Sequence, residues 1–193
     1  MWSGAMPNLQ KNPNSIPISP VQTLLIGGFI LTIIFLTYRN VLNNFFIGDD
    51  FPWLSHVIKM RSHFLEGLWE RYTWMGSSIA FYLNLLISGT NVWGYNLTNV
   101  LIHLVNSILV GCLGYFLTRD TLVGLLAMLM WGLNAQGNES ILWKTGRGHA
   151  LVLLFLLGSL AAFIVWDQKR QHWFYGLAIL SATCAQLTLF NAV

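Results

Sequence analysis

The hydrophobic positions of this chain fall into long continuous runs rather than alternating with polar ones. Continuous apolar runs of about 20 residues are typical of α-helices that cross a bilayer, whereas membrane-spanning strands alternate with a period of two. The pattern therefore predicts an all-α fold, a polytopic transmembrane helical bundle. The expected spans are residues 21–38, 94–117, 121–134, 150–166 and 173–190.

The segment between the first two expected spans has a different pattern. In Trp53–Trp69 apolar residues recur at helical spacing, which is typical of an amphipathic helix lying on the membrane surface. The charged or titratable residues of this stretch include His56, Lys59, Arg61 and Glu66. Ser77–Ile87 is apolar but too short to cross a bilayer, so we expect a second interfacial or re-entrant helix there. Both helices would belong to the first outer loop.

Composition supports a membrane protein. The 193 residues are 55% hydrophobic and 9% charged, whereas a soluble domain is about 25% charged. A net charge of +3 is too small to indicate nucleic-acid binding. Residues 1–20 form a polar tail, and no small-residue cleavage site follows the first apolar run, so we expect residues 21–193 to be one transmembrane module with an uncleaved first helix. Cys112 and Cys184 lie in apolar runs, and their spacing indicates no metal site.

Two adjacent carboxylates, Asp49 and Asp50, follow the first span within the aromatic stretch Phe45–Trp53. Phe and Trp near the end of a span are typical of the membrane–water interface, where charges are costly to keep. The pair can form an acid/base or cation-binding site facing the membrane surface. It can equally be a solvated turn whose carboxylates cap the next helix. The residues alone leave both interpretations open.

The second expected span carries a polar stripe. Asn99, His103 and Asn106 lie at i, i+4 and i+7, which places them on one helix face. Such residues form hydrogen bonds between helices or line a ligand cleft. In the second case Asn99 and His103 become candidate substrate-binding residues. Three further glycines are expected to let helices pack closely: Gly111, Gly114 and Gly124.

Asp49, Asp50 and Glu139 can lie close together only if their loops are on the same side of the membrane. The short charged turn Asp167–Arg170 favours an orientation with the N-terminus inside. With five spans, Asp49, Asp50 and Glu139 then fall on the same side of the membrane. Three carboxylates can bind a divalent cation, although no spacing in this sequence requires one.

Several short motifs occur in a recognisable order. Gly48-Asp49-Asp50 is followed by Gly94-Tyr95-Asn96-Leu97-Thr98-Asn99 and Leu101-Ile102-His103, then by Asn138-Glu139-Ser140-Ile141-Leu142-Trp143 and Gly146-Arg147. Over about residues 20–190 this order resembles the N-terminal part of polytopic GT-C glycosyltransferases. The most similar branch is the protein O-mannosyltransferase-like family with C-terminal tetratricopeptide repeats.

The resemblance implies an activity and a site. Such enzymes move a sugar from a polyprenyl-phosphate carrier to a protein or glycan acceptor on the outer or lumenal face of the bilayer. The catalytic role of their first-loop Asp carries over to Asp49 or Asp50, with Asp49 favoured. Glu139 and Arg147 match substrate-binding positions, and an Arg can hold a phosphate by paired hydrogen bonds. The resemblance implies the bacterial inner membrane or the endoplasmic reticulum as location.

The chain also departs from that family. Asn134-Ala135 stands where His-Pro is usual, and Arg71 is the base nearest to the expected Arg-Pro at Trp74-Met75. His149 stands where an acidic residue is common. Because the family has further spans, we expect the module to be incomplete at its C-terminus. Two alternatives remain: a non-catalytic membrane assembly partner or degenerate relative, and a transporter with the polar stripe along its path.

Overall fold

The computed structural model describes residues 17–134 and 140–189, together with the backbone alone of Glu139, and every regular element within them is helical. The α-helices are α1 (Pro20–Tyr38), α2 (Asp50–Lys59), α3 (Phe64–Glu70), α4 (Met75–Ser88), α5 (Val92–Thr118), α6 (Thr121–Gly132), α7 (Glu139–Leu142), α8 (Arg147–Lys169) and α9 (His172–Thr188). Two 3-10 helices, η1 (Arg39–Asn43) and η2 (Tyr72–Trp74), join neighbouring α-helices.

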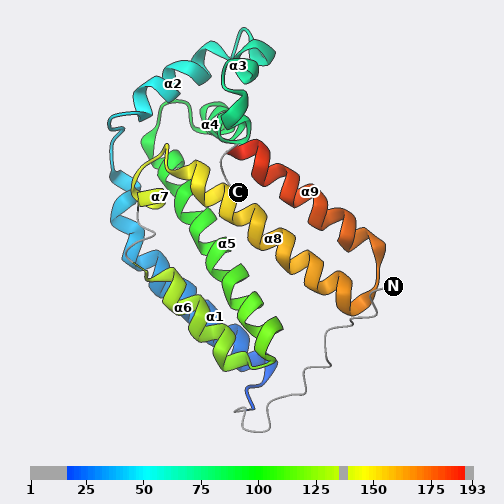
Figure 1. The fold of residues 1–193 in the computed structure, drawn as a ribbon. Helices are drawn as coiled ribbons and strands as arrows, with labels where there is room; N and C mark the ends of the chain where they lie inside the picture. Colours follow the sequence, from blue (N-terminus) through cyan, green and yellow to red (C-terminus); the bar gives the residue numbers. More distant parts are fainter. Residues whose placement is uncertain (1–16, 135–138, 190–193) are drawn as a thin grey trace.

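The long helices form a bundle, and three short ones gather at one end of it. Figure 1 shows α1, α5, α6, α8 and α9 running along the bundle, with α2, α3 and α4 together at one end. We call residues 50–88, which contain α2 to α4, the cap. Within the described residues, the segments long and apolar enough to cross a membrane are Pro20–Asn43, Val92–Thr118 and Arg147–Lys169. The predicted all-α helical membrane bundle is confirmed, whereas membrane crossing by α6 and α9 stays a prediction.

Local sequence explains where helices begin. Ser19 and Gln22 form a capping box at the start of α1, and Pro20 occupies the first turn, where its missing N–H costs nothing. Asn91 and Asp120 accept hydrogen bonds from the first turns of α5 and α6. Each polar side chain thus satisfies a backbone donor that the helix itself leaves unpaired.

Glycines bring α5 and α6 into direct contact. A Cβ atom on Gly111 would lie 2.9 Å from the Cβ of Met128, and one on Gly124 would lie 2.8 Å from the carbonyl oxygen of Gly111. Both distances are too short for any larger residue in this packing. The predicted close-packing role of these glycines is confirmed.

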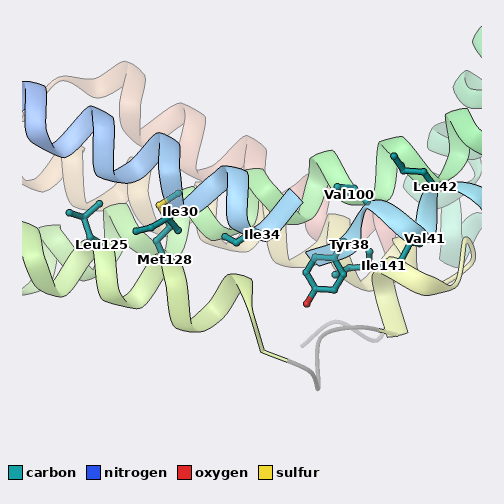
Figure 2. Close-up of a cluster of buried hydrophobic side chains, with 9 residues drawn as sticks. All are labelled: Ile30, Ile34, Tyr38, Val41, Leu42, Val100, Leu125, Met128 and Ile141. Carbon is teal, nitrogen blue, oxygen red and sulfur yellow. The ribbon is translucent and has the colours of Figure 1, made fainter. Parts of the chain in front are cut away.

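A buried apolar cluster joins the first helix to the rest of the bundle. It consists of Ile30, Ile34, Tyr38, Val41, Leu42, Val100, Leu125, Met128 and Ile141, contributed by α1, η1, α5, α6 and α7 (Figure 2). Because α7 joins this core, the short helix preceding α8 is held against α1 and α5. These contacts also fix the position of the segment between α7 and α8, which lines the candidate site.

The cap has its own core. Phe46, Trp53, Val57, Met60, Phe81, Leu85 and Tyr95 pack together where α2, α4 and α5 meet. The single amphipathic helix expected over 53–69 is wrong, because the structure divides that stretch into α2 and α3. The fully buried Met60 side chain lies against Gly67, and short-range hydrogen bonds such as Arg61 N–H to the Ile58 carbonyl, 3.2 Å, turn the chain between them.

Candidate functional site

A cavity of about 590 Å³ lies between the cap and the bundle. Its walls are Asp49, Trp53, Arg71, Trp74, His103, Asn106, Trp131, Ser140, Trp143, Thr145, Gly146, His149, Ala150 and Leu153. The cavity is open to the surface at Asp49 and His149, which are exposed, and is closed at His103 and Asn106, which are buried. Aromatic walls with a few polar groups are typical of small-molecule sites.

The two predicted catalytic carboxylates have different environments. Gly48 adopts a left-handed φ of 49°, and the chain turns there into α2. Asp49 is exposed, lines the cavity, and makes no side-chain capping bond within the described residues. Asp50 is fully buried: its carboxylate oxygens accept from Thr145 N–H at 3.0 Å and from Ile47 N–H at 3.1 Å.

Lys144 completes the support behind Asp50. Its Nζ lies 4.0 Å from the Asp50 carboxylate and donates to the carbonyls of Asn44, at 3.0 Å, and Phe45. Burial lowers the pKa of Lys144; nearby Asp50 opposes this effect, and nearby Arg147 adds to it. These contacts fasten the 44–50 loop to the 143–147 loop. The loop that carries Asp50 therefore meets the loop that leads to Arg147, whereas the placement of Asp49, Asp50 and Glu139 on one side of a membrane stays a prediction.

Arg147 lies inside the protein and is not among the cavity walls. Its Nε donates to the Asn99 side chain at 2.7 Å, and its Nη2 donates to the Tyr95 carbonyl at 2.9 Å. Its Nη1 donates to the Asn84 side chain and to the Ala80 carbonyl. Fully buried, the guanidinium ties the first turn of α8 to α4 and α5.

Two members of the predicted polar stripe also hold backbone in place. Asn99 accepts from Arg147 and donates to the carbonyls of Ser140 and Trp143 at 3.3 and 3.2 Å. The Nε2 of His103 donates to the Gly132 carbonyl at 3.0 Å, because a carbonyl can only accept. His103 nevertheless lines the cavity, whereas Asn99 lies behind its wall.

Glu139 is the remaining predicted site residue, and its side chain lies outside the described part of the chain. Among the described residues, no three His, Cys, Asp or Glu side chains gather as a metal site. Because the Glu139 carboxylate is not among them, a divalent cation bound by all three predicted carboxylates stays a prediction.

Arg71 is a wall residue that the sequence motifs leave unassigned. Its guanidinium carbon lies 4.5 Å above the Trp53 ring, a cation–π contact that orients the charge beside the cavity. Arg71 and the exposed carboxylate of Asp49 line the same cavity. From the sequence, Arg71 is only the base nearest to the position of the family's Arg-Pro, because its place on the cavity wall depends on how the cap folds back over α5 and α8.

The fold and site define the class of protein: a helical membrane bundle with an aromatic-walled cavity, open at an exposed carboxylate and flanked by an arginine. Among curated proteins, the chain is similar to the human protein O-mannosyl-transferase TMTC2, with 31% identity over 116 residues. The mouse protein O-mannosyl-transferase TMTC2 matches with the same identity and length. The match covers 57% of this chain and 14% of either relative. No protein-family model and no solved structure matches the chain.

Proposed function

We propose that the cavity is the reaction site of a membrane glycosyltransferase that takes a sugar from a polyprenyl-phosphate carrier. The acceptor would be a hydroxyl group of a protein or glycan at the outer or lumenal face. The similarity to a protein O-mannosyl-transferase supports a transferase. The observation that carries the proposal is Asp49, an exposed carboxylate on the wall of an aromatic cavity that also contains Arg71.

Asp49 is the general base in this proposal. Its carboxylate takes the proton of the acceptor hydroxyl while that oxygen forms a bond to the anomeric carbon of the sugar. The bond between that carbon and the carrier phosphate breaks, and the phosphate leaves with the bonding electrons. Asp50 is a positioning residue, because its buried hydrogen bonds hold the loop that presents Asp49.

Arg71 is the proposed ligand of the carrier phosphate. A guanidinium matches phosphate geometry, and the stacking on Trp53 holds this one beside the cavity. Arg147, which the family resemblance assigns to that role, already donates its hydrogen bonds to protein acceptors. The position of Arg71 on the wall supports it as the phosphate ligand, and Arg147 then acts by positioning α8.

The role of Asp49 as the general base can be tested in membranes that contain the protein. The measurement is the rate at which labelled sugar is transferred from a polyprenyl-phosphate carrier. We expect Asp49→Asn to lower the rate at least about 100-fold with normal membrane insertion, because a general base contributes about 10²–10⁴-fold. Glu66→Gln is the matched control, since Glu66 is an exposed cap carboxylate that does not line the cavity. Full activity in Asp49→Asn would exclude Asp49 as the base.

The non-catalytic alternative makes a different prediction. An assembly partner or degenerate relative would bind the lipid carrier without transferring its sugar. The amount of glycosylated product would then be the same with wild type, Asp49→Asn and Arg71→Gln. If wild-type membranes bind the carrier but form no glycosylated product with any acceptor offered, this alternative replaces the enzyme.

A further inference from the structure

The closed end of the cavity contains a buried amide with an unused acceptor. Asn106 is 2% exposed, and its Nδ2 donates to the Ala150 carbonyl at 3.0 Å. That bond fixes which amide atom is the oxygen, because a carbonyl cannot donate. The Oδ1 atom is buried and has no partner in the described part of the chain. Buried polar atoms in native proteins are nearly always paired, so this oxygen requires an explanation.

Two tryptophans of the same cavity wall also have unpaired donors. The Nε1 atoms of Trp131 and Trp143 are buried and lack a hydrogen-bond acceptor among the described residues. Both indoles line the cavity together with Asn106. A buried Trp N–H usually finds a partner, and here two of them accompany an unpaired acceptor.

The chemistry of these groups indicates what would satisfy them. Asn106, Trp131 and Trp143 are uncharged, whereas Asp49 and Arg71, which line the same cavity, carry charge. A hydroxyl group both donates and accepts, so a ring bearing several hydroxyls can serve two N–H donors and an amide oxygen together. Indole rings add apolar walls to the same space.

We propose that Asn106, Trp131 and Trp143 form the subsite for the sugar ring of the lipid-linked donor. This assignment rests on the proposed function and extends it, because it gives recognition of the sugar to these three residues and binding of the phosphate to Arg71. The two indole N–H groups donate to sugar hydroxyls, and the Asn106 oxygen accepts from one.

Trp166 provides a matched comparison. Its Nε1 is also buried without a partner among the described residues, but Trp166 lies near the end of α8 and is not among the cavity walls. An unpaired indole alone therefore does not indicate a sugar site. The proposal depends on three unpaired groups lining one cavity.

Two soluble probes separate the sugar from the carrier: a short-chain isoprenyl phosphate, and the same molecule with a mannosyl group. Their dissociation constants are measured by calorimetry on the purified protein in detergent. We expect wild type to bind the mannosyl form more tightly. Trp131→Phe and Trp143→Phe keep most of the ring but remove the N–H, and each should reduce this preference about two- to tenfold. Asn106→Leu should act similarly, and Trp166→Phe should leave the preference unchanged.

The outcomes distinguish the subsite from the function on which it rests. If neither probe binds, the proposed donor site itself is wrong. If both bind and the preference for the mannosyl form survives the three cavity substitutions, water satisfies these atoms and the subsite is wrong. Equal weakening of both probes in the cavity variants would also contradict it, because those residues would then act through cavity shape rather than through sugar hydroxyls.

Discussion

Asp50 and Lys144 form a buried pair at the point where the two loops of the site meet. Both side chains are fully buried, and both make additional hydrogen bonds to backbone groups of the opposite or neighbouring loop. Removing charges from water is costly, and such a pair is retained only where further hydrogen bonds compensate. The pair therefore serves to fix loop geometry, and with it the position of Asp49.

Removing one member of this pair should lower the stability of the protein. We expect Asp50→Asn to cost about 3 kcal/mol, because it leaves the Lys144 ammonium buried without its counter-charge. Thermal unfolding in detergent measures the loss. The double variant Asp50→Asn with Lys144→Met should be more stable than Asp50→Asn alone, since the uncompensated charge is then gone. Additive losses would show that the two groups do not interact.

Arg147 is expected to be irreplaceable even by lysine. Its planar guanidinium reaches Asn84, Asn99 and the Tyr95 carbonyl from one position, which a single ammonium cannot do. Arg147→Lys should lower stability by about 2–3 kcal/mol, because buried acceptors lose their donors. The control is Arg170→Lys, an exposed residue paired with Asp167 at 2.9 Å, which should change stability by less than about 1 kcal/mol. Similar losses in both variants would contradict a special role for Arg147.

His56 should make the cap sensitive to acid. Burial first and nearby Arg71 second lower its pKa, while Glu70, 3.5 Å from Nδ1, opposes the shift. Because the folded-state pKa lies below the unfolded value of about 6.5, protonation favours the unfolded state. The stabilisation is present above about pH 6.5 and is lost as the pH falls below that value. Melting temperatures should therefore drop on acidification, and His56→Gln should flatten the profile, whereas a substitution at exposed His63 should not.

At the scale of helices, the α5–α6 contact depends on the absence of side chains. We expect Gly111→Val to cost about 1–3 kcal/mol, because its added atoms would overlap Met128 and the Gly124 backbone. Gly28→Val is the matched control, since nothing lies within 4 Å of a Cβ at Gly28. Thermal unfolding of the two variants compares them directly. Equal stability would show that α5 and α6 can separate without cost.

Helices were easier to predict from the sequence than the site. The apolar runs identify the long helices, because a helix that crosses a bilayer must be about 20 residues long and apolar. Both properties can be read from one continuous stretch of sequence. The break between α2 and α3 escaped prediction, since it depends on Met60 packing against Gly67 across the turn. Likewise Asp49 and His103 were singled out and do line the cavity, whereas the roles of Arg71 and Lys144 could not be predicted, because they depend on which loops meet in space.

At the scale of the whole molecule, the described residues also form a groove that is large enough for a lipid-linked ligand. This groove of about 950 Å³ lies between α1, α5 and α6, with walls that include Leu24, Leu31, Phe116 and Leu125. Its walls, as far as the structure describes them, contain no charged side chain, so an anionic phosphate would lack a cationic partner there. The aromatic cavity beneath the cap, in contrast, has both Arg71 and the Asp49 carboxylate on its walls.

Mapping where the donor sugar lies tests the account most directly. A polyprenyl-phosphate mannose with a photoreactive group on the sugar would be cross-linked to the protein in membranes, and the labelled peptides would be identified by mass spectrometry. We expect labelling at or next to Asn106, Trp131 and Trp143, which line the cavity beneath the cap, and competition by the unmodified donor. Labelling confined to residues 18–31 and 108–125, the walls of the apolar groove, would contradict the assignment of the cavity as the sugar-transfer site.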